Sequence, residues 1–241
     1  MQWHDLLFMH WPVPAEDLRP AIPPGLEIDT FEGCAWVGIV PFVMRGVRPR
    51  YLPAVPGLSH FPELNVRTYV YARGAGSREA GKPGVWFFSL DAHQPVAVRL
   101  ARLAFRLPYF DARMAAATDA QGTVRYVSRR THAGAPPADF RARYRPTGPP
   151  EEADDLTRFL TERYCLYAAR APSGGNATGA EAVVYRGEIH HRPWPLQPAE
   201  AQVETNTLAD ALPFDLPERA PHLRFARRLD VRAWLPSRVA T

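Results

Sequence analysis

The stretch FPELNVRTYVYARGAGSREAGKPGVWFFSLDA, residues 61–92, decides the fold. Two runs rich in aromatic and β-branched residues, 64–72 and 85–90, flank a connection rich in glycine, serine and charged residues. Such runs favour strands and such a connection supplies a turn, so the stretch predicts a long β-hairpin. Side chains alternate between the two faces of a strand. One face of the first run is therefore apolar, and the other presents Glu63, Asn65, Arg67, Tyr69 and Tyr71 in order.

The overall composition fits one globular domain that spans residues 1–241. The chain has 241 residues, of which 46% are hydrophobic, and this is enough to bury a substantial core. Of the 29 basic residues only Lys82 is a lysine, and the formal net charge is +4. The arginines are scattered among acidic residues rather than massed in a run, which argues against a nucleic-acid-binding tail. We therefore predict no nucleic-acid partner.

Targeting signals and metal-binding patterns are not recognisable in the sequence. The N-terminal segment has no basic region or cleavage site, and no apolar run approaches the roughly 20 residues that span a bilayer. We therefore expect a cytoplasmic protein that does not contact a membrane. Cys34 and Cys165 lie far apart in apolar surroundings, which predicts buried free thiols. Neighbouring His190 and His191 would point to opposite faces of a strand, so we predict no metal site and no cofactor.

Upstream of the central hairpin, the pattern predicts three further strands and a loop. Trp3–Trp11 predicts a first strand, which two prolines end. Leu26–Phe31 and Cys34–Met44 predict a second hairpin with Glu32 and Gly33 as its two-residue turn. The second arm is almost continuously apolar, so we expect it to be buried on both faces, with Pro41 marking a bulge or an edge. The proline- and arginine-rich segment 45–60 predicts a loop that could act as a lid or bind a partner.

Downstream of the hairpin, the clearest signal is a helix over Pro95–Phe105. Its predicted core stripe is Val96, Leu100, Leu103 and Leu107, at helical spacing. Arg99, Arg102 and Arg106 share the opposite flank, where a solvated face is a better interpretation than an anion site. We also expect Asp91 to cap this helix.

The rest of the chain predicts a second helix and several strands. The helix covers Glu151–Arg163, with Leu156, Phe159 and Leu160 inward. With about ten strands, two helices and no alternation of strands and helices, we predict a mainly β (α+β) protein: a curved antiparallel sheet or barrel with helices outside. The predicted strands are Tyr109–Thr118, Thr123–Thr131, Phe140–Arg145, Tyr164–Arg170, Ala182–His191 and Arg224–Leu235.

The polar face of the first hairpin strand is the best chemical constellation. Consecutive side chains on one face lie about 7 Å apart, so Glu63 could orient Arg67 across Asn65 or act as a base beside it. A buried arginine can clamp a carboxylate, and a buried carboxyl group can have its pKa raised into the catalytic range. Two interpretations stay open: a lined cavity, which Tyr69 and Tyr71 favour, and a solvent-exposed face with a weak ion pair.

Seven segments together give the sequence a family resemblance over nearly its whole length. It resembles the YqjF-like family of uncharacterised bacterial proteins. This resemblance implies an acetoacetate decarboxylase-like fold, a cone-shaped β-barrel that encloses a central pocket, with about two helices outside. The segments that carry it are HWPV, DTFEGCAWVGIVPF, ELNVRTYV, GVWFFSLDA, LPY, ERYCLY and IHHRPWPL.

Acetoacetate decarboxylases carry a Phe-Pro-Lys-Lys run, whose first lysine forms a Schiff base with a β-keto acid. The similar segment here is Leu107–Phe110, so Tyr109 and the phenylalanine after it replace the lysines. The single lysine, Lys82, lies in the polar connection of the hairpin. The resemblance thus implies a pocket without Schiff-base decarboxylation, with Glu63 and Arg67 as its carboxylate and anion anchor and Tyr109 near its centre.

Two functional hypotheses follow. The first is a pocket that binds a small anionic or carbonyl-bearing molecule through Arg67, with Asn65 and Tyr69 as further ligand-binding residues. The second is an enzyme that uses Glu63 and Tyr109 as acid and base in a lyase, isomerase or hydrolase reaction. We favour binding, because the sequence shows no activating partner for either catalytic candidate. Barrels with exposed edge strands can pair, so a homodimer is a further hypothesis.

Overall fold

The protein was analysed as a computed structural model, which describes residues 1–48, 53, 55, 58–74, 76–170, 178–179 and 182–239. In chain order, its helices and strands are β1 (Gln2–Val13), α1 (Ala15–Leu18), β2 (Leu26–Ile28), β3 (Ala35–Arg45), β4 (His60–Ala72), β5 (Gly84–Ala92), α2 (Pro95–Ala104), β6 (Tyr109–Thr118), β7 (Val124–Arg130), β8 (Asp139–Pro146), α3 (Asp155–Thr161), β9 (Cys165–Arg170), β10 (Val183–His190), β11 (Ala199–Asn206), β12 (His222–Asp230), β13 (Arg232–Ala233) and β14 (Ser237–Arg238).

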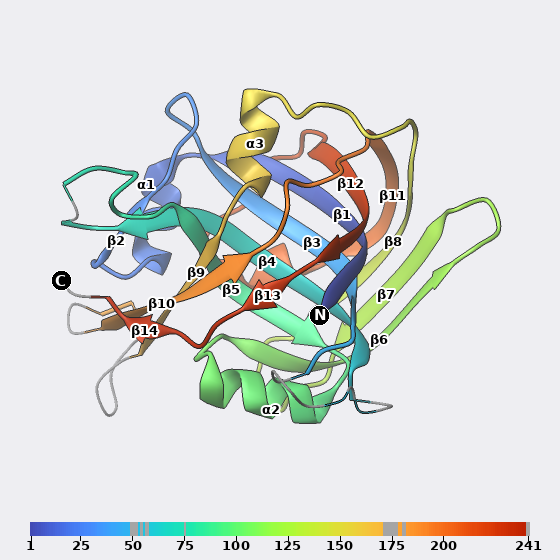
Figure 1. Ribbon diagram of the computed structural model, residues 1–241, viewed down its shortest axis with the longest axis horizontal. Coiled ribbons are helices and arrows are strands. Elements are labelled where there is room, and N and C mark those ends of the chain that lie inside the picture. The colour runs from blue at the N-terminus through green and yellow to red at the C-terminus, as the bar shows by residue number, and fades with distance from the viewer. Residues whose placement is uncertain are drawn as a thin grey trace.

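The described residues form a strongly curved, 14-stranded sheet (Figure 1). Its main path runs β11-β8-β7-β6-β5-β4-β3-β1-β12, and an isolated bridge between Gln197 and Phe225 brings the chain before β11 against β12. The sheet is therefore a nearly closed barrel, which confirms the predicted mainly β class. No helix in the described part of the chain is long and apolar enough to cross a membrane.

The central hairpin forms as predicted. β4 and β5 pair antiparallel from Glu63↔Ala92 to Val70↔Gly84, with a register shift after Val66. β3 is buried along nearly its whole length between β1 and β4, as its apolar sequence predicts. Pro41 lies opposite the irregular part of the β1–β3 ladder, so its missing N–H costs no regular pairing there.

The second predicted hairpin is wrong in its pairing. Glu32 and Gly33 do form a tight turn with positive φ angles of 49° and 81°, as a two-residue loop requires. This turn closes a single bridge, Phe31–Cys34, and β2 leaves to pair with β4 instead of β3. Cys34 is consequently exposed rather than buried, whereas Cys165 is buried as predicted, and both thiols are free.

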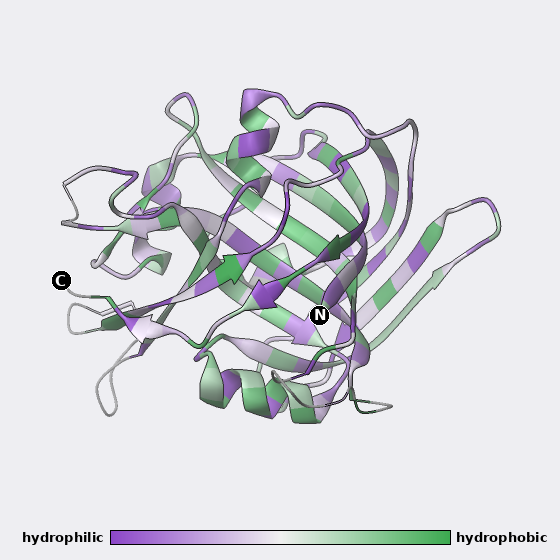
Figure 2. Cartoon of the chain, in the orientation of Figure 1, coloured by the Kyte–Doolittle hydropathy of each residue, from purple (hydrophilic) through white to green (hydrophobic). Residues whose placement is uncertain are grey.

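Helix α2 lies at the predicted position, but of the predicted core stripe only Leu107 is buried, and Val98 is the buried residue of the helix instead. Val96, Leu100 and Leu103 are 49%, 61% and 78% exposed, and Figure 2 shows apolar residues on the outward surface of the helix. The arginines of the flank make contacts with the ends of their side chains: Arg99 pairs with Asp111 at 2.8 Å, Arg102 donates to the Tyr109 carbonyl at 2.5 Å and Arg106 covers the Tyr185 ring. The predicted solvated arginine flank is correct for Arg99, whose side chain is 60% exposed, and for Arg102, which is also exposed, whereas Arg106 is partly buried.

The second helix is shorter than predicted, and one strand was not predicted. The second helix covers only Asp155–Thr161, and Asp154 caps it by accepting from the Thr157 N–H at 2.7 Å. Strand β11 is absent from the sequence prediction. The proposed lid or partner-binding segment 45–60 lies largely outside the described residues.

The inner sheet is buried on both faces. Even-numbered residues of β4, such as Leu64 and Val66, pack in the barrel interior with residues of β1, β3, β7 and β8. The outer face of β1, β3, β4 and β5 packs under a second layer that includes β9, α2, α3 and the connector around Trp194. In Figure 1, β9, β10 and β13 cross in front of this face.

Candidate functional site

The polar face of β4 is buried under this second layer. Glu63 is 2% exposed, Asn65 4%, Arg67 9% and Tyr69 0%. The alternation in β4 therefore separates an apolar face inside the barrel from a polar face outside it. For these four residues the solvent-exposed interpretation is wrong, and only Tyr71, nearer the end of the strand, is partly exposed.

Three neighbouring strands bring a histidine against this face. His10 on β1, Gly38 on β3 and Arg67 on β4 stand in register. A Cβ at Gly38 would lie 2.8 Å from Cδ2 of His10 and 3.5 Å from Cγ of Arg67, so only glycine admits both side chains here. His10 Nε2 lies 2.6 Å from the Tyr69 hydroxyl. Burial and the Arg67 charge hold the pKa of His10 well below its usual value, so the ring is neutral.

Arg67 is a buried cation without a carboxylate partner in the described residues. Its guanidinium donates a long hydrogen bond of 3.5 Å to the Tyr69 hydroxyl and faces the rings of Phe8 and Tyr69. By contrast, the buried guanidinium of Arg163 pairs with Asp29 at 2.5 Å. A buried charge is normally paired with an opposite charge, so the environment of Arg67 would suit a bound anion.

Glu63 and Tyr109 form a buried acid pair at the other end of the face. The Tyr109 hydroxyl donates to Glu63 Oε2 at 2.9 Å. Burial raises the pKa of the Glu63 carboxyl from 4.5 to about 8, against the opposing effect of this hydrogen bond. No hydrogen bond or ion pair joins Glu63 to Arg67, which lie four residues or about 13 Å apart along the strand. The idea that Glu63 orients Arg67 is therefore wrong, while the partner that the sequence did not reveal is Tyr109.

Several buried polar atoms on this face have no hydrogen-bond partner in the described residues. Atoms of this kind normally find partners, so together they mark a place suited to a polar molecule. Two of their residues, His10 and Trp36, were not identified from sequence, because only the pairing of β1, β3 and β4 brings His10 beside Arg67 and Trp36 against Tyr69. The four atoms are His10 Nδ1, Trp36 Nε1, Asn65 Oδ1 and Arg67 Nε.

Asp91 does not cap α2. Its side chain pairs with Arg130 at 2.9 Å, and both side chains are buried. The cap is Gln94, whose Oε1 accepts from the Val96 N–H at 3.0 Å. Asp91 shares the β5 face opposite Leu64, so it belongs to the barrel interior rather than to the candidate site. Across the described part of the chain, no three His, Cys, Asp or Glu side chains gather where they could hold a metal ion.

Comparisons with known proteins agree with this architecture. A family described as "Uncharacterized conserved protein", DUF2071, matches residues 1–230. The chain is 44% identical over 234 residues to the uncharacterized protein YqjF of Bacillus subtilis, covering 96% of this chain and 88% of that one.

Solved structures of similar fold have little sequence identity to the chain. An acetoacetate decarboxylase-like enzyme from Sphingomonas wittichii aligns with a TM-score of 0.66 at 12% identity, covering 99% of this chain and 91% of the other. The enduracididine biosynthesis enzyme MppR, in complex with a condensation product of pyruvate and imidazole 4-carboxaldehyde, gives 0.64 at 12% identity, with coverage of 99% and 89%. These matches show that the fold is acetoacetate decarboxylase-like.

Proposed function

The chain belongs to the DUF2071 family of uncharacterized conserved proteins, and for this chain we propose that the buried face of β4 binds a small carboxylate-bearing molecule at Arg67. The observation that carries the proposal is the Arg67 guanidinium, 9% exposed and without a carboxylate within 4.0 Å in the described residues. A bound carboxylate would supply the missing countercharge and could accept two parallel hydrogen bonds.

A ligand several carbons longer than pyruvate, bound by its carboxylate at Arg67, would meet Glu63 and Tyr109 with its other end. A carboxyl group with a pKa near 8 is mostly protonated at neutral pH, so Glu63 can donate to a carbonyl or hydroxyl oxygen. Asn65 lies between the two ends on the same face. A carboxylate with a carbonyl or hydroxyl group therefore fits the order of charges and donors along β4. The pyruvate-derived ligand of MppR supports testing 2-oxo acids first.

A Schiff-base mechanism does not fit the residues present. Lys82 is the single lysine of the sequence, and its side chain is 52% exposed and paired with Glu188 at 3.1 Å. The segment that resembles the lysine pair of acetoacetate decarboxylases holds Tyr109 instead. Any chemistry on this face is therefore non-covalent with respect to lysine.

The second candidate function is acid–base catalysis by Glu63 and Tyr109. Their hydrogen bond and the raised pKa of Glu63 favour it, since a carboxyl group that is protonated near neutral pH can act as a general acid. A lyase, isomerase or hydrolase reaction on a bound carbonyl compound would use this proton. In that case Glu63→Gln abolishes turnover while ligand binding at Arg67 persists.

The test of binding is a thermal-shift titration with pyruvate and lactate, and with methyl pyruvate as an uncharged control. A ligand at about 100 times its Kd stabilises the native state by about 2.7 kcal/mol, which raises Tm by about 5–10 °C in a domain of this size. In Arg67→Met we expect this shift to vanish. The Tm without ligand should not fall, because methionine fills the space without burying a charge.

Arg125→Met is the matched control, since Arg125 is exposed on β7. Its variant should keep the full ligand-induced shift. Binding that survives Arg67→Met, or methyl pyruvate that binds as well as pyruvate, would refute Arg67 as the anion anchor.

A further inference from the structure

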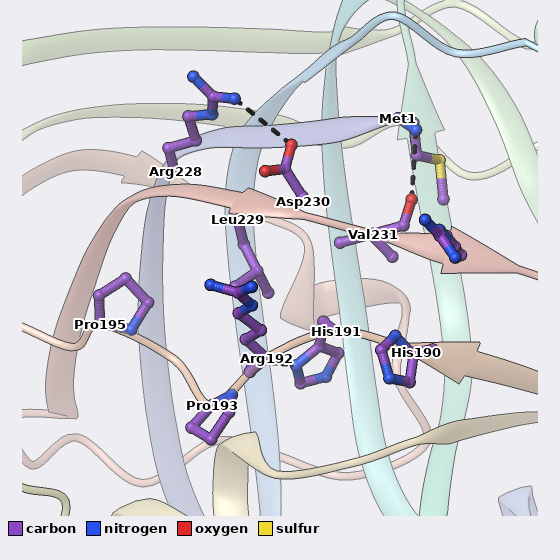
Figure 3. A pocket seen from close by; sticks show the side chains of 11 residues that line it. Met1, His190, His191, Arg192, Pro193, Pro195, Arg228, Leu229, Asp230 and Val231 are labelled. Atoms are coloured by element: carbon purple, nitrogen blue, oxygen red, sulfur yellow. Dashed lines mark hydrogen bonds and ion pairs between the residues drawn. The ribbon is translucent and has the colours of Figure 1, made fainter.

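A second candidate site, which none of the polar residues of β4 lines, is a pocket of about 890 Å³. One wall is the end of β12 continued into β13, and the other is the segment His190–Pro195 that follows β10. Figure 3 shows Arg192 extending from the second wall toward the strand that carries Leu229. The volume is within the range of pockets that hold small organic molecules.

Both walls of this pocket are anchored by buried residues. Leu229 and Val231 are buried at 5% and 2% exposure, which fixes the strand wall. On the other wall, His191 is buried, contacts the carbonyls of Arg192 and Arg163 at 2.8 and 3.3 Å, and stacks on Tyr164. The backbone that carries the side chains of the pocket is therefore set by the fold.

The charge of the pocket is strongly positive. It is lined by three arginines, Arg192, Arg228 and Arg232, and by one acid, Asp230. Asp230 lies 3.5 Å from Arg228, whereas Arg192 and Arg232 have no carboxylate within 4.0 Å in the described residues. One acid against three arginines leaves two positive charges uncompensated. Arg48 adds to this field: the pKa of the Met1 amine is lowered by burial, and further by Arg48 and Arg232 against the opposing effect of Asp230.

We propose that this pocket binds a phosphorylated small molecule, with its phosphate held by Arg192 and Arg232. The planar guanidinium matches phosphate geometry, and a phosphate monoester carries about −1.5 to −2 charges, close to the excess in the pocket. The volume is far larger than a free phosphate needs. The organic part would rest on Pro193, Pro195 and Leu229, which supply an apolar lining.

The test is isothermal titration calorimetry of the full chain with phenyl phosphate and inorganic phosphate, at constant ionic strength. Charge-assisted hydrogen bonds are each worth about a factor of ten or more in affinity, so Arg192→Gln/Arg232→Gln should weaken phenyl phosphate about a hundredfold. Arg113→Gln/Arg125→Gln removes the same charge from two exposed arginines on β6 and β7 and should bind like the wild type. All four positions are exposed, so both double variants should fold.

The outcomes separate the alternatives. Phenyl phosphate bound more tightly than inorganic phosphate supports an organic phosphate as the ligand, whereas equal affinities overturn the role of the apolar lining. Equal losses in the two double variants would show a general charge effect and overturn the site. No binding of either probe by the wild type would also overturn it. Arg67→Met should leave phenyl phosphate binding intact, which keeps this result independent of the β4 face.

Discussion

The buried carboxyl group of Glu63 predicts a specific pH dependence of stability. Its pKa is 4.5 in an exposed setting and about 8 in the folded protein, because burial disfavours the charged form. Between these two values the folded state binds the proton more tightly than the unfolded state. Stability must therefore fall as pH rises through this window, and the full penalty is present above pH 8.

The size of the effect follows from the pKa difference. A difference of about 3.5 units corresponds to about 5 kcal/mol, at about 1.4 kcal/mol for each pH unit. Glu63→Gln removes the titrating group and keeps an oxygen that can accept from the Tyr109 hydroxyl. The variant should match the wild type near pH 4.5 and become more stable than it by several kcal/mol at pH 8.5. Asp91, whose pKa burial raises to about 6, titrates in both proteins and cancels in the comparison.

The assay is urea denaturation followed by circular dichroism, at half-unit steps from pH 4.5 to 8.5. Glu16→Gln, at an exposed position of α1, controls for the loss of one carboxylate and should show no such trend. A difference between Glu63→Gln and the wild type that stays constant across this range would refute the reasoning. It would mean that Glu63 is already ionised in the folded protein at low pH.

Three further variants test the surroundings of the site by chemical denaturation. Asp91→Asn at pH 8 should cost about 3–5 kcal/mol because it leaves a buried guanidinium unpaired, and adding Arg130→Met should recover much of this loss. Gly38→Ala should cost about 1–3 kcal/mol, since its Cβ meets the His10 ring at 2.8 Å. Leu103→Gln should change stability by no more than about 0.5 kcal/mol, because this leucine is 78% exposed. If the losses of stability from Asp91→Asn and Arg130→Met simply added, the ion pair would be contradicted. An unchanged stability of Gly38→Ala would contradict its close contact with His10. A large loss in Leu103→Gln would contradict the exposure of this leucine.

The strands that were predicted correctly show a clear pattern of apolar and β-branched residues in their own sequence. In β4, alternation alone separated Glu63, Asn65 and Arg67 from the apolar residues between them, and burial of the polar face was left open. Alternation reports which residues share a face, but it does not report what covers that face. The cover comes from β9, α3 and the connector after β10, all distant in sequence.

The wrong or missing predictions for α2, β11 and β2 concern features that depend on contacts with residues distant in sequence. The spacing of apolar residues located α2 correctly but not its buried face, because Val98 rather than Val96, Leu100 or Leu103 packs on the sheet. Strand β11, with the sequence AEAQVETN, alternates small or apolar residues with polar ones, but it holds only one β-branched aliphatic residue and most of it is exposed, so its strand signal is weak. β2 has too few residues to fix its partner locally.

The division of β4 between two faces also affects how reliably the chain can fold. A slip of one residue in its pairing would place Glu63 and Arg67 in the interior of the barrel and turn Leu64 and Val66 toward the polar layer. Such a misaligned sheet would bury two ionisable groups among aliphatic side chains, at a cost of several kcal/mol for each. The polar face of β4 therefore also disfavours misaligned pairing of this strand. A single-residue insertion in β4 should be tolerated far less well than an insertion of two.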